Sequence, residues 1–305
     1  SVVDLRGDVP FTEFNVEGNY APALDKSQAV YNSLLALIDE AIGNLNNTEA
    51  PNLLKPASDD LIYNGDKNKW IRMGNTLKLK LLVQSRKAKG EITGWNEKLT
   101  ALLAENNFMK DKEDFEFKHT AKDNPDERNP AYVDEYLGGQ STYYISPWLF
   151  ETMSGSDLNV KDNPFAGIAD PRIPYYWVNQ IKADGEAQNT TDYRSGAFVS
   201  IFFASNSSSS GNDQRSTSSF IGIYPCGGKY DDGNGGKCDK SVGTGIAPEK
   251  MLQAYSVPFL LAELYLTGEV TGDAKAALEA GIKRSITHVN TVSQAAKASG
   301  VTVPT

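Results

Sequence analysis

The chain has 305 residues, of which 40% are hydrophobic and 10% aromatic, so it can bury a large core and is too apolar to be disordered. Its 30 basic and 39 acidic side chains give a net charge of −9, which opposes binding to nucleic acid and other polyanions. No apolar run approaches the roughly 18 residues that a membrane-spanning helix requires.

Residues 1–118 are expected to contain two antiparallel helices joined by a proline-containing loop. Asp25 followed by Gln28 resembles a capping box, and apolar residues then recur at helical spacing. Asp66 stands at the expected start of the second helix, because its carboxylate can accept hydrogen bonds from the first-turn amides. The apolar periodicity then predicts a long helix that ends near Lys87.

A third helix and a strand are expected later in this N-terminal part. Trp95, Leu99 and Phe108 lie on one apolar stripe, which predicts a helix that ends near Asn106. The alternating run Phe115-Glu116-Phe117 is typical of a short strand.

Residues 119–247 are rich in Gly, Ser, Asn, Asp and Pro, which excludes long helices. Short helices are predicted at 130–137 and 147–153, since each begins with a proline and proline suits the first helical turn. Short strand pairs are expected around 175–178 and 197–203. This segment is interpreted as a loop-rich insert that the helices present.

Residues 248–305 return to helical patterning. A helix is predicted to start at Pro248 and to be kinked at Pro258, because proline removes one internal hydrogen bond. A second helix is expected to begin after Asp273 and to end near Val292. Four residues are expected to face inward: Ala277, Leu278, Ile282 and Ile286. The predicted fold class is mostly α, with tetratricopeptide-like helical hairpins carrying a large loop-rich insert with short strands.

The chain has two cysteines, Cys226 and Cys238, in a glycine-rich segment. Neither has a CxxC partner or a histidine at the spacing of a zinc site, so they form either a disulfide or two reduced thiols. Asp231 and the acidic residues after it could offer oxygens to calcium, but the EF-hand spacing is absent and a solvated turn is favoured. No metal and no cofactor are expected.

Several stretches together resemble the SusD/RagB family, and they occur in the order found in that family. The stretches are Gly7-Asp8-Val9-Pro10-Phe11, Asp39-Glu40-Ala41-Ile42, Asp60-Leu61-Ile62-Tyr63-Asn64-Gly65-Asp66, Asp170-Pro171-Arg172 and the run from Tyr255 to Gly268. Each motif alone is weak, whereas their common order is a fairly specific indication.

The resemblance implies a single SusD-like domain over residues 1–305. It also implies a lipid-anchored protein on the outer membrane of a Gram-negative bacterium, which binds glycan or another small nutrient and delivers it to a TonB-dependent transporter. Family members begin with a lipidated cysteine and extend further at both ends, so the resemblance implies that the anchor and the C-terminal end lie outside this sequence.

Sugar binding requires flat aromatic faces for pyranose rings, together with polar groups for hydroxyls. Eight residues of the insert are the candidates: Tyr143, Tyr144, Trp148, Tyr175, Tyr176, Trp177, Tyr193 and Arg194. The alternative for each of them is that it anchors the insert to the helices.

No enzyme is expected. The sequence has no G-x-S-x-G, HExxH or P-loop pattern, and with only His119 and His288 no nucleophile–histidine pair can be singled out. The alternative function is a tetratricopeptide-like adaptor that binds peptides between helical hairpins.

Overall fold

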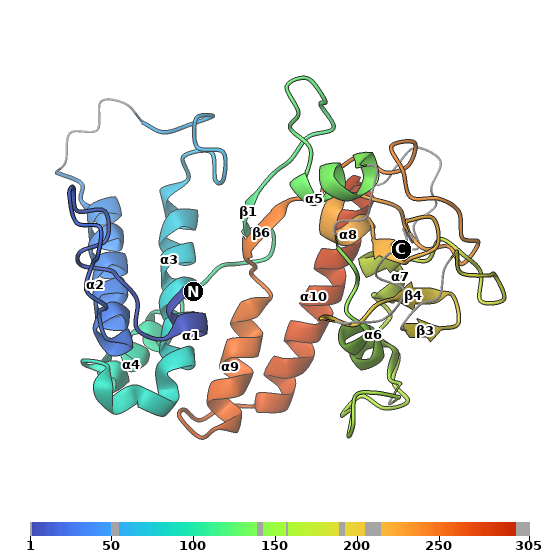
Figure 1. Ribbon diagram of the computed structural model, residues 1–305. Coiled ribbons are helices and arrows are strands. Elements are labelled where there is room, and N and C mark those ends of the chain that lie inside the picture. The colour runs from blue at the N-terminus through green and yellow to red at the C-terminus, as the bar shows by residue number, and fades with distance from the viewer. Residues whose placement is uncertain are drawn as a thin grey trace. The chain divides into compact units, whose positions relative to one another are not determined.

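Figure 1 shows the computed structural model of the chain, which describes residues 2–49, 55–138, 143–156, 158–188, 193–204 and 215–296. The chain forms two compact units. Unit 1 comprises residues 1–116 and 250–284, and unit 2 comprises residues 117–249 and 285–305. The predicted fold class is confirmed, because helices dominate and the strands are few and short. The single-domain organisation stays a prediction.

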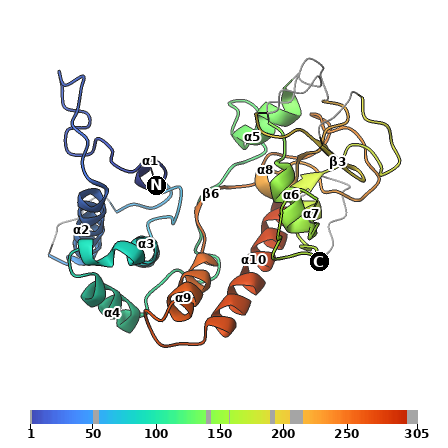
Figure 2. The same cartoon turned by 60° about the horizontal axis from the view of Figure 1, so that its bottom comes forward.

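Helices α2 (Ser27–Asn46) and α3 (Lys67–Ser85) form the predicted hairpin of unit 1. They lie side by side in both views (Figures 1 and 2). Asp66 caps α3 as predicted, because its Oδ1 accepts hydrogen bonds from the backbone N of Asn68 at 3.0 Å and of Lys69 at 3.2 Å.

The predicted cap of α2 by Asp25 is wrong. The N-cap residue is Lys26, and its side chain makes no capping bond. The Asp25 carboxylate instead accepts from the backbone amides of residues 11 and 12, both at 2.9 Å. The first-turn amide of Ser27 donates to Oδ1 of Asp8 at 3.0 Å. The cap therefore comes from a segment far earlier in the chain, which local spacing cannot reveal.

Three further helices and two strands belong to or border on unit 1. They are α1 (Val2–Arg6), η1 (Arg86–Glu91), α4 (Trp95–Glu105), β1 (Phe115–Phe117) and β6 (Glu249–Leu252). The third helix and the first strand are thus confirmed. Apolar side chains from α2, α3, α4 and α9 form the core of this unit, including Leu35, Leu79, Leu82, Leu99 and Leu264.

The second hairpin consists of α9 (Ser256–Leu266) and α10 (Ala274–Ala296). The predicted helix start at Pro248 is wrong, because strand β6 occupies that stretch. Pro258 is the third residue of α9, where the backbone N–H would have no partner within the helix. The predicted kink is therefore wrong too, since this proline removes no helical hydrogen bond.

The predicted inward face of α10 is largely wrong. Leu278 and Ile282 are both 46% exposed and Ile286 is 37% exposed. The buried positions are mostly small: Gly281, Ser285, Val289, Val292, Ser293 and Ala296. At Gly281 an added Cβ would lie 2.9 Å from the ring of Phe259. Close approach thus sets the packing at Gly281, whereas Val289, Val292 and Ala296 join an apolar cluster with Ile223 and Tyr224.

In the part of unit 2 that the structure describes, four short helices and a short π-helix precede the C-terminal half of α10. These elements are α5 (Pro130–Tyr132), η2 (Val133–Leu137), α6 (Pro147–Ser154), α7 (Ile173–Tyr176) and α8 (Ile223–Cys226). The short helices predicted at 130–137 and 147–153 are confirmed. The strand predicted from residue 175 starts two residues later, because Tyr175 and Tyr176 belong to α7.

The sheets of unit 2 are two-stranded and antiparallel. Strand β2 (Trp177–Val178) pairs with β5 (Phe220–Ile221), and β3 (Tyr193–Ser195) pairs with β4 (Phe198–Ser200). In the second sheet Tyr193 is opposite Ser200. Within the residues that the structure describes, no helix has the length and apolar character needed to cross a membrane.

Candidate ligand-binding site

Helix α6 buries one face and presents a tryptophan on the other. Phe150 and Met153 are buried, whereas Trp148 is 47% exposed. This division follows from helical spacing, since residues three apart share a face. The ring of Phe150 stacks on Phe198 of β4, with centroids 3.9 Å apart and planes 13° apart. The stacked pair holds α6 against the β3–β4 sheet and thereby fixes Trp148.

Phe202, which is half-buried, forms an aromatic pair with the exposed Trp148. Their ring centroids are 5.3 Å apart and their planes meet at 50°. Oγ of Ser200 donates to the carbonyl oxygen of Ile145 at 2.5 Å, which ties β4 to the segment before α6. We call Trp148 and Phe202 the aromatic platform. The sequence analysis missed Phe202 as a site residue, although it lies in the stretch predicted as a strand.

Tyr143 lies on the segment that leads into α6. Its side chain is 56% exposed, and its backbone N donates to Oε1 of Glu135 at 2.9 Å. Glu135 is buried on η2. The buried carboxylate therefore positions an exposed tyrosine close in sequence to the aromatic platform.

The fully buried carboxylate of Glu151 organises the loop after α6. Its Oε2 accepts from the backbone N of Asn159 at 2.8 Å and of Val160 at 2.7 Å, and Oε1 accepts from Nδ2 of Asn159 at 2.6 Å. Burial acts to raise the pKa of Glu151, but these hydrogen bonds outweigh it and hold the pKa below its usual value. The sequence analysis missed Glu151. The one local signal for it is that a charged residue lies on the apolar face of a predicted helix.

Two of the predicted ligand contacts belong to the core. Trp177 is 1% exposed and Tyr193 is 5% exposed. The ring of Trp177 lies 5.9 Å from that of Phe150, and the ring of Tyr193 lies 5.6 Å from that of Phe202 in an edge-to-face arrangement. Tyr193 therefore packs against the aromatic platform, and Trp177 packs against the Phe150–Phe198 pair. Both side chains are buried.

The tyrosines of α7 are half-buried and pack on other tyrosines. Tyr175 meets Tyr230 and Tyr176 meets Tyr224, each with ring centroids 5.0 Å apart. These contacts link α7 to α8 and to the glycine-rich turn after it. They match the anchoring alternative for both residues.

Arg194 is exposed, but its guanidinium is bonded to the chain. Nε donates to the carbonyl oxygen of Gly196 at 3.0 Å, and Nη2 donates to that of Ala183 at 3.1 Å. Tyr144 is half-buried beside the exposed Tyr143. Of the predicted residues, the structure thus leaves Tyr143 and Trp148 most open to a ligand.

A family model described as "Starch-binding associating with outer membrane" matches residues 1–299. The chain belongs to this SusD-like family. The resemblance found in the sequence motifs is therefore confirmed. No curated protein matches the SusD-like chain.

Solved structures show the same fold. A chitin-binding SusD homologue from Flavobacterium johnsoniae is 19% identical, with a TM-score of 0.61 and coverage of 93% of this chain and 48% of that chain. A SusD-like protein from Bacteroides thetaiotaomicron is 20% identical, with a TM-score of 0.62 and coverage of 94% and 50%. The SusD-like chain thus spans about half the length of these relatives.

The glycine-rich turn of the SusD-like chain is held by hydrogen bonds. Oδ2 of Asp231 accepts from Nδ2 of Asn179 at 2.7 Å, and Oδ1 accepts from the backbone N of Gly233 at 3.0 Å. Cys226 and Cys238 are both buried, and Sγ of Cys226 donates to the carbonyl oxygen of Gly222 at 3.3 Å. A disulfide between them stays a prediction. In the part of the chain that the structure describes, no group of three or more His, Cys, Asp or Glu residues is placed to hold a metal ion.

Proposed function

We propose that this SusD-like chain binds a starch-like glycan at the bacterial surface without altering it chemically. The family description names starch binding and association with the outer membrane. The observation that carries the proposal is the aromatic platform, in which Trp148 and Phe202 lie side by side with Trp148 47% exposed. The proposal includes delivery of the glycan to a TonB-dependent transporter and a lipid anchor in the complete protein.

The aromatic platform suits stacking of sugar rings. The C–H face of a pyranose is apolar and loses water favourably against an aromatic ring. Because the two ring planes meet at 50°, consecutive sugars of a bent glucan can each lie on one ring. Tyr143, which is 56% exposed, adds a hydroxyl that can donate to and accept from sugar hydroxyls.

The test is binding of maltoheptaose by isothermal titration calorimetry. Trp148→Ala is expected to weaken binding by more than about 1 kcal/mol, because the stacking face is lost. Phe14→Ala is the matched control, since Phe14 is a 72% exposed aromatic of unit 1. Unchanged unfolding curves would show that both variants are folded. Equal binding by Trp148→Ala and the parent chain would refute the site.

The same samples test the remaining parts of the proposal. We expect no increase in reducing ends when maltoheptaose is incubated with the protein for hours. Co-purification of the complete protein with an outer-membrane transporter would support delivery. If the protein binds neither maltoheptaose nor other glycans but captures peptides, the adaptor function would replace the proposal.

A further inference from the structure

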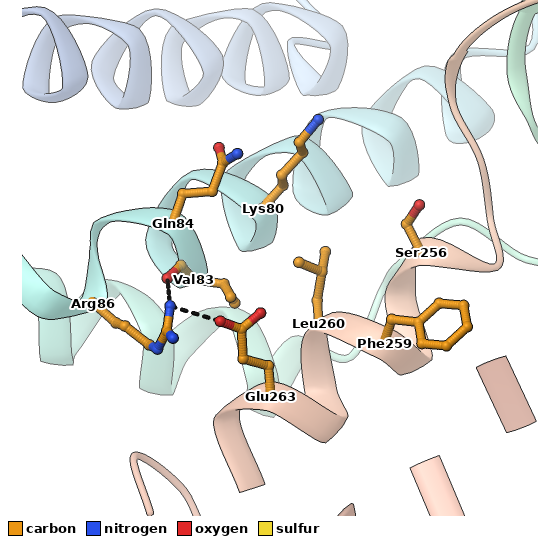
Figure 3. Close-up of a pocket in the computed structure, with 8 residues that line it drawn as sticks. All are labelled: Lys80, Val83, Gln84, Arg86, Ser256, Phe259, Leu260 and Glu263. Carbon is orange, nitrogen blue, oxygen red and sulfur yellow. Dashed lines mark hydrogen bonds and ion pairs between the residues drawn. The ribbon is translucent and has the colours of Figure 1, made fainter. Parts of the chain in front are cut away.

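Unit 1 contains a groove that does not include the residues of the aromatic platform. It lies between α3 and α9 and has a volume of about 470 Å³, which is within the range of small-molecule sites. Figure 3 shows the side chains that line it: Lys80, Val83, Gln84, Arg86, Ser256, Phe259, Leu260 and Glu263. The groove therefore has the size and the mixed polarity of a ligand site.

Two of the charged side chains of the groove neutralise each other. Nη1 of Arg86 lies 2.6 Å from Oε1 of Glu263, and it also donates to the carbonyl oxygen of Val83 at 3.2 Å. Figure 3 shows both interactions at one end of the groove. Neither charge is thus available to a ligand unless the pair is broken.

Lys80 supplies a charge that is not compensated. Its side chain is half-buried, and it makes no hydrogen bond or ion pair with any residue that the structure describes. By contrast, Lys78 on the same helix is paired with Asp39. An ammonium without a partner favours an anionic ligand.

The remaining lining combines neutral polar groups with an apolar floor. Gln84 lies one helical turn after Lys80, and the two side chains extend from the same side of α3 (Figure 3). The Ser256 hydroxyl stands on the α9 side, and the Leu260 side chain points from α9 toward α3. Val83 is 1% exposed and closes the floor.

We propose that this groove binds a small sugar that carries one carboxylate, such as a uronate. Lys80 holds the carboxylate, while the Gln84 amide and the Ser256 hydroxyl bond to sugar hydroxyls. The aliphatic side chain of Leu260 contacts the C–H face of the ring. One free cation selects a single negative charge, since a second one would find Arg86 already paired with Glu263. This site lies in unit 1 and does not depend on the function proposed for the aromatic platform of unit 2.

The test compares binding of glucuronate and glucose by calorimetry at low salt. The parent chain is expected to bind glucuronate at least about tenfold tighter than glucose, because a charge-assisted hydrogen bond is present only with the acid. Lys80→Gln is expected to abolish that preference. Lys87→Gln is the matched control, because it removes the same charge from an exposed side chain that does not line the groove. Loss of the preference in both variants, or in neither, would overturn the proposal.

Three further measurements separate the groove from its alternatives. Glu263→Gln frees the charge of Arg86 and is expected to tighten glucuronate binding by a few-fold, whereas weaker binding would contradict the charge assignment. Cyclohexanecarboxylate has the charge and the ring without hydroxyls, and it is expected to bind about tenfold more weakly than glucuronate. Equal binding of the two acids would overturn the roles of Gln84 and Ser256. Trp148→Ala is expected to leave glucuronate binding unchanged, and a loss there would move the site to the aromatic platform.

Discussion

Unit 1 and unit 2 satisfy their backbone polar groups in different ways. In unit 1 the long helices bond to themselves, and apolar stripes fill the core. In unit 2 buried side chains take over part of this role. Nε2 of Gln180 donates to the carbonyl oxygen of Ser218 at 2.8 Å, and Nδ2 of Asn129 donates to that of Ala247 at 3.0 Å.

This difference predicts which substitutions destabilise each unit. A helix in unit 1 depends on apolar volume, so truncation of a buried leucine is the damaging change there. A loop in unit 2 depends on particular polar atoms, so even an isosteric change of a buried polar residue is damaging. Four substitutions test this comparison, from the largest expected effect to the smallest.

Leu82→Ala in α3 tests the dependence of unit 1 on apolar volume. Leu82 is fully buried, and the substitution is expected to lower the free energy of unfolding by about 2–5 kcal/mol through lost contacts and a cavity. Urea denaturation followed by far-UV circular dichroism measures this. Leu266→Ala is the control, because Leu266 is 80% exposed and its loss is expected to cost under about 0.5 kcal/mol.

Glu151→Gln tests the dependence of unit 2 on polar atoms. Glutamine has nearly the same volume, but it replaces one carboxylate oxygen by an NH2 group, which cannot accept a hydrogen bond from a backbone N–H. The substitution is therefore expected to lower the free energy of unfolding by about 1–3 kcal/mol. Faster hydrogen exchange at the amides of Asn159 and Val160 is the local measurement. Glu186→Gln on an exposed loop is the matched control and is expected to change neither. Normal protection of both amides in Glu151→Gln would break the comparison.

Asp60, in the turn before α3, shows that unit 1 also contains polar centres of this kind. Burial acts to raise its pKa, but bonds from Nε1 of Trp70 at 2.8 Å and from the backbone N of Gly65 at 2.9 Å and Ile62 at 3.0 Å hold the pKa at about 2. Because the folded pKa is below the unfolded one, the ionised carboxylate stabilises the fold at neutral pH. That stabilisation is lost as the pH falls from about 4 toward 2.

Asp60→Asn is therefore expected to cost about 1–2 kcal/mol at pH 7 and progressively less as the pH falls below 4. Urea denaturation at a series of pH values gives the two curves. Asp59→Asn in the exposed part of the same turn is the control, and its curve is expected to follow that of the parent chain. A difference between Asp60→Asn and the parent that persists at pH 2 would contradict the assignment.

Pro258→Ala gives the smallest effect. Because Pro258 lies in the first turn of α9, its replacement is expected to change the free energy of unfolding by less than about 1 kcal/mol. Ala262→Pro, placed inside the same helix, is expected to cost about 3 kcal/mol or more. A large gain in stability on removing Pro258 would show that the proline does strain the helix.

The helices of unit 1 could largely be predicted from the sequence, because their determinants are local. Asp66 and the stripe that follows it specify α3 within one stretch of chain. The cap of α2 could not be predicted, since Asp8 supplies it from a segment folded back on the helix. The buried face of α10 could not be predicted either, because Gly281 and Ser285 are buried there without being large apolar residues.

The candidate site in unit 2 was only partly predictable. Tyr143 and Trp148 are exposed, whereas Trp177 and Tyr193 are core residues in a segment of similar composition. The difference arises from contacts with Phe150 and other residues distant in sequence, so composition cannot distinguish the two groups. Binding of a ligand by the exposed residues stays a prediction.

The segment after α6 returns to the helix at both ends. Asn159 is held by Glu151 near the start of the segment, and near its end the backbone N of Asp170 donates to the carbonyl oxygen of Met153 at 2.6 Å. Between these ties, Phe165 and Ile168 are 51% and 65% exposed. Asn163 adds a buried tie, since its Nδ2 donates to the carbonyl oxygens of Glu151 at 3.0 Å and of Ser156 at 2.6 Å. Substitutions confined to Phe165 and Ile168 would therefore change the exposed surface of this segment and leave its anchoring bonds intact.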